Sequence, residues 1–148
     1  MIKHKLINTI ATALYERLSE YKNNVEMLLE SRDADTKSSA GDKYETSREM
    51  TQIEINKLSE MLNLNSIILK DLLKIDANLT QHTVELGSIV TTITGKYFIS
   101  VAFGKIKVDN EEYYAISKTS PFASTIQGKK VGDKISFQNR VIEIIEII

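Results

Sequence analysis

Two apolar stripes at heptad spacing restrict the first half of the chain to a pair of long helices. Both follow alternating steps of three and four residues, which is the spacing of one seam on a helix. Their members are Ile7, Ala11, Leu14, Leu18, Tyr21, Val25 and Leu28 in the first, and Leu58, Met61, Asn65, Ile68, Leu72 and Ile75 in the second. Neither helix could bury its stripe alone, so the two are expected to pack together. Asn65, a polar member, is expected to fix the register of the pair at some cost in stability.

A short polar stretch at residues 31–45 separates the two stripes. It is too short to let the helices run parallel, so the sequence predicts an antiparallel coiled-coil hairpin over residues 1–78, with 31–45 as its tip. The tip carries four acids, namely Asp33, Asp35, Asp42 and Glu45. Asp42 and Glu45 form a capping-box pattern at the start of the second helix. Asp33 and Asp35 have no capping role there, and two interpretations stay open, a solvated turn or acids that face an active site.

Further apolar residues widen the surface of the second helix beyond one seam. They are Ile53, Ile55, Leu62, Leu64, Ile67, Leu69 and Leu73. Part of this excess is expected to pack on a second domain or on a partner.

Residues 84–148 follow a different pattern. Five of the six glycines and the only proline lie beyond residue 84, which indicates a boundary within residues 76–84. β-branched and aromatic residues predict strands at 89–93, 96–103, 112–116, 134–137 and 141–147. Ser120 as N-cap and Pro121 at the first helical position predict a short helix over 121–127. The expected fold class is therefore α+β, a helical hairpin followed by a small antiparallel sheet with one short helix.

Composition excludes several classes of function. The chain has 148 residues, a formal net charge of −1 and no cysteine. A near-neutral chain is not expected to bind DNA directly through a basic surface, and disulfides and thiolate metal sites are excluded. No apolar run is long enough to span a membrane, so a cytoplasmic protein is expected.

Several segments resemble the GreA/GreB family of bacterial transcript-cleavage factors and their shorter relatives. Residues 84–90, the run from Ser-Pro at 120–121 through Gly-Lys at 128–129 to Gly-Asp at 132–133, and the final strand at 140–148 are similar to the family's second domain. In the hairpin, Tyr44, Arg48 and Glu49 occupy positions that match the family pattern. The resemblance implies an FKBP-like fold for residues 84–148.

The resemblance also implies a partner and a site. The second domain would dock on RNA polymerase, and the hairpin would enter the secondary channel and bring its tip to the active-site magnesium. Asp33 and Asp35 would share that Mg²⁺ with the polymerase, because Mg²⁺ prefers carboxylate oxygens. The residues implied in polymerase binding are Tyr44, Arg48, Ser120, Pro121 and Phe122. Ser38 stands where cleavage-competent members carry a glutamate, so stimulation of transcript cleavage is left open.

The leading interpretation is therefore a Gre-like transcription elongation regulator that acts as a monomer. It is not expected to be an enzyme or to hold a cofactor of its own, apart from the shared magnesium. An alternative is a structural or interaction module that dimerises through the hairpin without polymerase activity. A third interpretation is an FKBP-like prolyl isomerase, although the aromatic-lined pocket that such an enzyme needs is not evident from the sequence.

Overall fold

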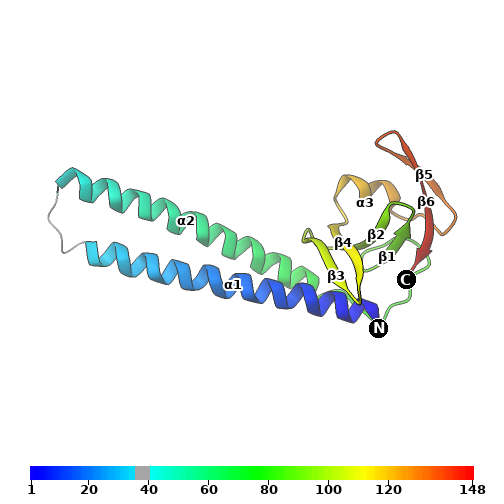
Figure 1. Cartoon of the computed structure of the whole chain (residues 1–148), viewed down its shortest axis with the longest axis horizontal. Coiled ribbons are helices and arrows are strands. Elements are labelled where there is room, and N and C mark those ends of the chain that lie inside the picture. Colours follow the sequence, from blue (N-terminus) through cyan, green and yellow to red (C-terminus); the bar gives the residue numbers. More distant parts are fainter. Residues whose placement is uncertain (36–40) are drawn as a thin grey trace. The chain divides into compact units, whose positions relative to one another are not determined.

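Two long helices form the first half of the chain, as predicted. A computed structural model of the chain (Figure 1) describes residues 1–35 and 41–148, with the side chains of residue 35 and residues 41–44 left out. Helix α1 spans Ile2–Asp35 and α2 spans Gly41–Leu72, which are 34 and 32 residues long. Each helix is therefore about 50 Å long.

The hairpin is antiparallel. Figure 1 shows α1 and α2 side by side, and a hydrogen bond joins them near the end of α1. The guanidinium of Arg32 donates through Nη1 to Oε1 of Gln52 over 2.7 Å. Arg32 lies three residues before the end of α1, whereas Gln52 lies in the first half of α2, as expected for two helices that run in opposite directions.

The chain divides into two compact units, and the division runs through both helices. The first unit contains Met1–Thr12 and Lys70–Ile148, and the second contains Ala13–Leu69. The boundary expected from composition, within residues 76–84, lies inside the first unit.

Burial in the second unit follows the predicted stripes in part. Leu14, a member of the first stripe, is fully buried, whereas Met61, a member of the second, is exposed. Ile55 and Leu69 are nearly fully buried, although the prediction placed them outside the stripe. Asn65 is buried, but its Nδ2 donates to the carbonyl of Met61 over 2.7 Å, within α2 itself. The described hydrogen bond therefore does not reach α1, and it gives no support to the expectation that Asn65 fixes the register of the pair.

The sheet has six strands and is mixed rather than antiparallel throughout. The strands are β1 (Ile89–Thr92), β2 (Gly95–Ser100), β3 (Gly104–Val108), β4 (Glu111–Ser117), β5 (Lys134–Phe137) and β6 (Arg140–Ile147). Their order is β3-β4-β2-β1-β6-β5. All neighbours are antiparallel except β2 and β4, which pair in parallel with Phe98 opposite Ala115. The α+β class is confirmed, but the sequence missed β3, which lies between β2 and β4 along the chain and pairs on the far side of β4.

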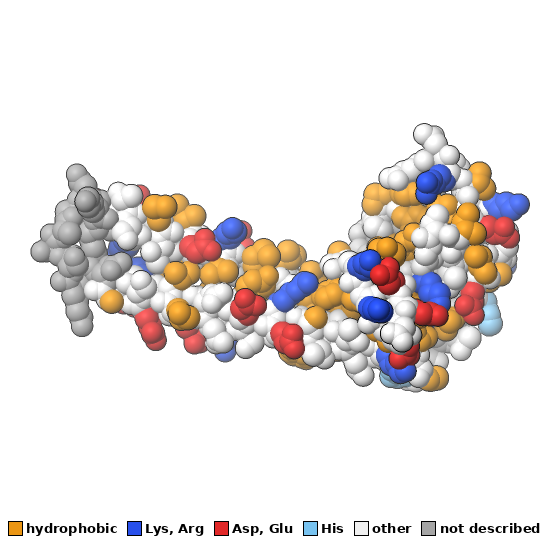
Figure 2. Space-filling model, viewed as in Figure 1, with side chains coloured by type: hydrophobic (Ala, Val, Ile, Leu, Met, Phe, Trp, Pro, Cys, Tyr) orange, Lys and Arg blue, Asp and Glu red, His pale blue; other side chains and the backbone are white. Residues whose placement is uncertain are grey.

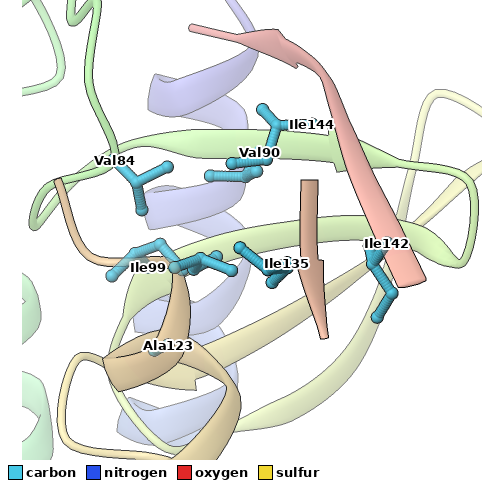
Figure 3. Close-up of a cluster of buried hydrophobic side chains, with 8 residues drawn as sticks. Val84, Val90, Ile99, Ala123, Ile135, Ile142 and Ile144 are labelled. Carbon is cyan, nitrogen blue, oxygen red and sulfur yellow. The ribbon is translucent and has the colours of Figure 1, made fainter. Parts of the chain in front are cut away.

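One side of the sheet is buried under the short helix α3 (Pro121–Ile126). Figure 3 shows the cluster of buried side chains, which come from four strands, α3 and the segment before β1. Its members are Val84, Val90, Ile99, Ala123, Ile126, Ile135, Ile142 and Ile144. Phe98 and Ile89, the chain neighbours of Ile99 and Val90, are also buried, and side chains alternate along a strand. The opposite side of β1 and β2 is therefore covered as well.

The start of α1 belongs to the same unit as the sheet. Leu6 and Ile10 are fully buried there. Nζ of Lys3 donates to the carbonyl of Leu79 over 2.6 Å, and Nζ of Lys5 pairs with Asp109 at the β3–β4 turn over 2.7 Å. Burial lowers the pKa of Lys3, and the nearby Asp76 carboxylate opposes that shift. These contacts fix the first turns of α1 to the sheet unit.

Candidate functional site

Asp33 lies in the last turn of α1, beside an arginine that contacts α2. Its side chain is 67% exposed, and its Oδ1 accepts from Nη2 of Arg32 over 3.3 Å. The same guanidinium donates to Gln52, whose Nε2 donates to Oδ1 of Asn56 over 2.9 Å. Arg32 is thus held against α2, and Asp33 is placed beside it with most of its surface open to solvent.

The position of Asp33 is electrostatically unfavourable for the helix. The C-terminal end of a helix carries a partial negative charge, so a carboxylate in the last turn costs stability rather than adding to it. Arg32 in the same turn offsets part of this cost. Helix stability therefore does not account for Asp33, which favours its interpretation as a functional acid. Asp35 is the last residue of α1, and its side chain lies outside the described residues.

The acids near the start of α2 can be explained by helix electrostatics. α2 begins at Gly41, so Asp42 lies inside the first turn and is not the N-cap that the capping-box pattern predicts. Acids near the N-terminus of a helix are favourable because that end carries a partial positive charge. Glu45 is exposed, as is Arg48. The side chains of Asp42 and Tyr44, and the turn residues Ser38 and Ser39, lie outside the described part of the chain.

The described tip residues do not form a metal site by themselves. Within residues 1–34 and 45–148, whose side chains are described, no group of three or more histidine and acidic side chains could hold a metal ion. Asp33 and Glu45 could each contribute one carboxylate to a metal held mainly by another protein. This donor set fits Mg²⁺, which is commonly bound through one or two carboxylates.

Ser120, Pro121 and Phe122 lie at the start of α3, where they have structural roles. Ser120 is the N-cap, with its Oγ accepting from the amide of Ala123 over 3.2 Å, as predicted. Pro121 is exposed at the first position of the helix. Phe122 is half-buried, with its ring centroid 4.5 Å from that of Tyr97 and 5.2 Å from that of Phe137. Of these three residues, which the resemblance implies in polymerase binding along with Tyr44 and Arg48, Pro121 alone is exposed.

An aromatic-lined cavity opens beside α3, contrary to the expectation from the sequence. It has a volume of about 240 Å³ and is lined by Thr94, Tyr97, Phe122, Phe137, Gln138, Arg140 and Ile142. These residues come from three segments that are distant in the sequence, and no local pattern brings them together. The contact between Arg32 and Gln52 was also missed, because no local pattern in the sequence indicates that these two residues meet.

Comparisons with known proteins identify no family for this chain. No protein-family model matches it, and no curated protein matches it either. Among solved structures, that of the transcription factor Gfh1 is similar over 93% of this chain and 92% of the other, with 16% sequence identity and a TM-score of 0.35. A similarity this low does not assign a function. Among the described residues, no helix is both long enough and apolar enough to cross a membrane.

Proposed function

We propose that the chain is a Gre-like regulator of transcription elongation that binds bacterial RNA polymerase and brings its hairpin tip into the secondary channel. The observation that carries the proposal is Asp33, an exposed carboxylate near the end of a long paired helix, where helix electrostatics disfavour an acid. The family resemblance of residues 84–90 and 120–133 supports the same assignment.

The chain's contribution to chemistry would be placement rather than catalysis of its own. Magnesium in the polymerase active site stabilises charge on the attacking and leaving oxygens of an RNA phosphodiester. Asp33 and Asp35 would add carboxylate oxygens to that site. Arg32, hydrogen-bonded to Gln52 of α2, would hold the last turn of α1 in position. This order would favour binding, because groups that are already ordered lose less entropy when they bind.

A transcript-cleavage assay on backtracked elongation complexes tests this proposal. We expect the wild-type chain to change the rate of cleavage or of elongation, and Asp33→Ala/Asp35→Ala to remove that effect. The matched control is Glu16→Ala/Glu20→Ala, which deletes two exposed acids from the middle of α1 and should behave as wild type. An unchanged effect in the tip variant would remove both acids from the proposed mechanism.

The aromatic cavity favours one second candidate function, an FKBP-like peptide-binding or prolyl-isomerase activity of the sheet unit. Aromatic walls and a few polar groups are typical of pockets that bind small apolar groups. A prolyl-isomerisation assay with short peptides tests it. Activity that is lost in Phe137→Ala would support it, and a rate equal to the uncatalysed one would exclude it.

A further inference from the structure

Helix α2 carries a second heptad seam, on the side turned away from its buried residues. The outer seam consists of Met50, Ile53, Lys57, Glu60, Leu64 and Ile67, which follow the same three-four spacing as the inner stripe. All six are exposed, and the four apolar members are 67%, 66%, 53% and 49% exposed in chain order. At ~100° per residue, the centre of the outer seam lies about 150° around the helix from that of Ile55, Asn65 and Leu69.

This seam is not explained by the hairpin. The inner face of α2 is buried, so α1 does not cover the outer seam as well. A helix on the surface of a monomer carries one apolar stripe opposite a polar face, whereas heptad positions on a second face are typical of a helix with two helical neighbours. Figure 2 shows hydrophobic side chains on the surface along the described length of the helix pair. The outer seam therefore has the pattern of an interface without its partner.

The two charges at the centre of the seam indicate which partner fits. Among the described residues, neither Lys57 nor Glu60 takes part in an ion pair. They occupy neighbouring heptad positions at the midpoint of the seam, with two apolar residues on each side. The seam therefore reads apolar, apolar, positive, negative, apolar, apolar along α2.

An antiparallel second copy complements this pattern at every position. When two identical helices run in opposite directions about a two-fold axis at the midpoint, Lys57 of each copy lies beside Glu60 of the other. In the same arrangement Ile53 lies beside Leu64 of the second copy, and Met50 lies beside Ile67. A parallel pair would instead place Lys57 beside Lys57 and Glu60 beside Glu60, and like charges at such positions repel.

We propose that the outer seam of α2 is a homodimer interface in which two copies pack antiparallel. Its four apolar side chains bury one another, and two reciprocal Lys57–Glu60 pairs set direction and register, the role that polar heptad positions perform in coiled coils. The proposal does not depend on polymerase binding, since it rests only on exposure, spacing and charge order along α2. The dimer is a state of the free chain, because the proposed function needs the hairpin of a single copy to enter the channel, and the two copies would separate first.

Charge reversal tests the proposed register. We expect the full wild-type chain to show concentration-dependent dimerisation in sedimentation equilibrium between ~1 and ~100 µM. Lys57→Glu creates two like-charge contacts and should raise the dissociation constant about tenfold or more. Lys57→Glu/Glu60→Lys restores both opposite-charge contacts and should return the constant close to the wild-type value. The matched control is Lys22→Glu, the same change of charge on the exposed surface of α1.

Three outcomes would overturn the proposal: a wild-type chain that stays monomeric at ~100 µM, a Lys57→Glu variant that dimerises like wild type, or a swapped variant that does not recover. Circular dichroism of each variant checks that the helices remain folded. All the charged positions are solvent-exposed, so the substitutions leave the buried face of α2 intact.

Disulfide trapping tests the direction independently, because the chain has no cysteine of its own. A mixture of Ile53→Cys and Leu64→Cys chains should form a mixed disulfide, since these positions are adjacent in the antiparallel dimer. Ile53→Cys alone should not, because the two copies of residue 53 would lie about 16 Å apart, beyond the ~7 Å Cα separation that a disulfide spans. A disulfide between two Ile53→Cys chains, without a mixed disulfide between Ile53→Cys and Leu64→Cys chains, would indicate a parallel pair and contradict the proposal.

Discussion

Asp33 and Ser120 are both short polar residues at helix ends, and their surroundings differ. The carboxylate of Asp33 lies at the C-terminal end of α1, where it weakens the helix and stays open to solvent. The hydroxyl of Ser120 lies at the N-terminal end of α3 and accepts from a backbone amide that has no partner within the helix. The fold explains the second position directly, whereas the first is the position that the proposed function uses.

Replacing Ser120 by alanine tests the capping role. Ser120→Ala should lower the free energy of unfolding by about 1 kcal/mol, because the amide of Ala123 loses its acceptor. Ser136→Ala, an exposed position on β5, is the control and should change stability by less than about 0.5 kcal/mol. Urea denaturation measures both values. A loss in Ser120→Ala no larger than in the control would show that the cap does not stabilise α3.

Tyr113 makes stability depend on pH in the alkaline range. Burial and a hydrogen bond to Glu111 raise the pKa of Tyr113 from 10.0 to about 12. Because the folded pKa is above the unfolded one, the stabilisation is fully present below pH 10 and is lost as the pH rises towards 12. The carboxylate of Glu111 also accepts from Nζ of Lys96, and this contact joins β4 to β2.

The phenylalanine variant isolates this group. Tyr113→Phe should remove the part of the alkaline decline in unfolding free energy that belongs to Tyr113. Urea denaturation at several pH values from 8 to about 11.5 measures the slope, and the tyrosinate absorbance of the folded protein should lose its component with the highest pKa. An identical decline in wild type and variant would contradict the assignment.

At the scale of elements, the helices could be predicted and the strand pairing could not. Helical spacing depends on residues three and four apart, so the stripe from Ile7 to Leu28 and the extent of α1 are visible locally. Strand pairing depends on residues far apart in the chain. Nothing near Phe98 or Ala115 indicates that β2 and β4 pair in parallel with β3 outside them. The turn between β3 and β4 has a local signature, because Asp109 and Asn110 both have positive φ, as a tight hairpin turn requires.

Asn65 provides the test of what holds the helix pair together. Because its described hydrogen bond is to Met61 of the same helix, burying the amide brings no described hydrogen bond with α1. Asn65→Leu should therefore stabilise the second unit by about 1 kcal/mol through added apolar burial. Urea denaturation followed by helical circular dichroism gives the change. A loss of stability, or a change in the register of the pair, would restore the original expectation that Asn65 specifies how the helices align.

At the scale of the whole chain, composition indicated two parts but not how the helices are shared between them. The glycine and proline content changes near residue 84, yet the first turns of α1 and everything after Leu69 belong to the unit that contains the sheet. Lys3 and Lys5 make contacts with residues more than 70 positions away, which no local pattern reveals. The aromatic cavity has the same origin, since Tyr97, Phe122 and Phe137 lie on three separate elements.

The function proposed for the chain likewise combines parts that are separate in the sequence. The acids lie at the ends of α1 and α2 that meet the tip, and the segments that resemble a polymerase-docking domain lie in the other unit. A tip variant that still binds the polymerase but loses its effect would separate the two contributions. Loss of binding in a tip variant would instead assign the main contact to the hairpin.

The most direct test locates the tip relative to the polymerase active site. Fe²⁺ replaces Mg²⁺ in purified bacterial RNA polymerase, and the hydroxyl radicals that it generates cut any protein backbone nearby. With the full wild-type chain bound, the account predicts cuts within residues 31–45 that disappear when excess Mg²⁺ is added. Absence of binding to the polymerase, or cuts confined to residues 84–148, would contradict it.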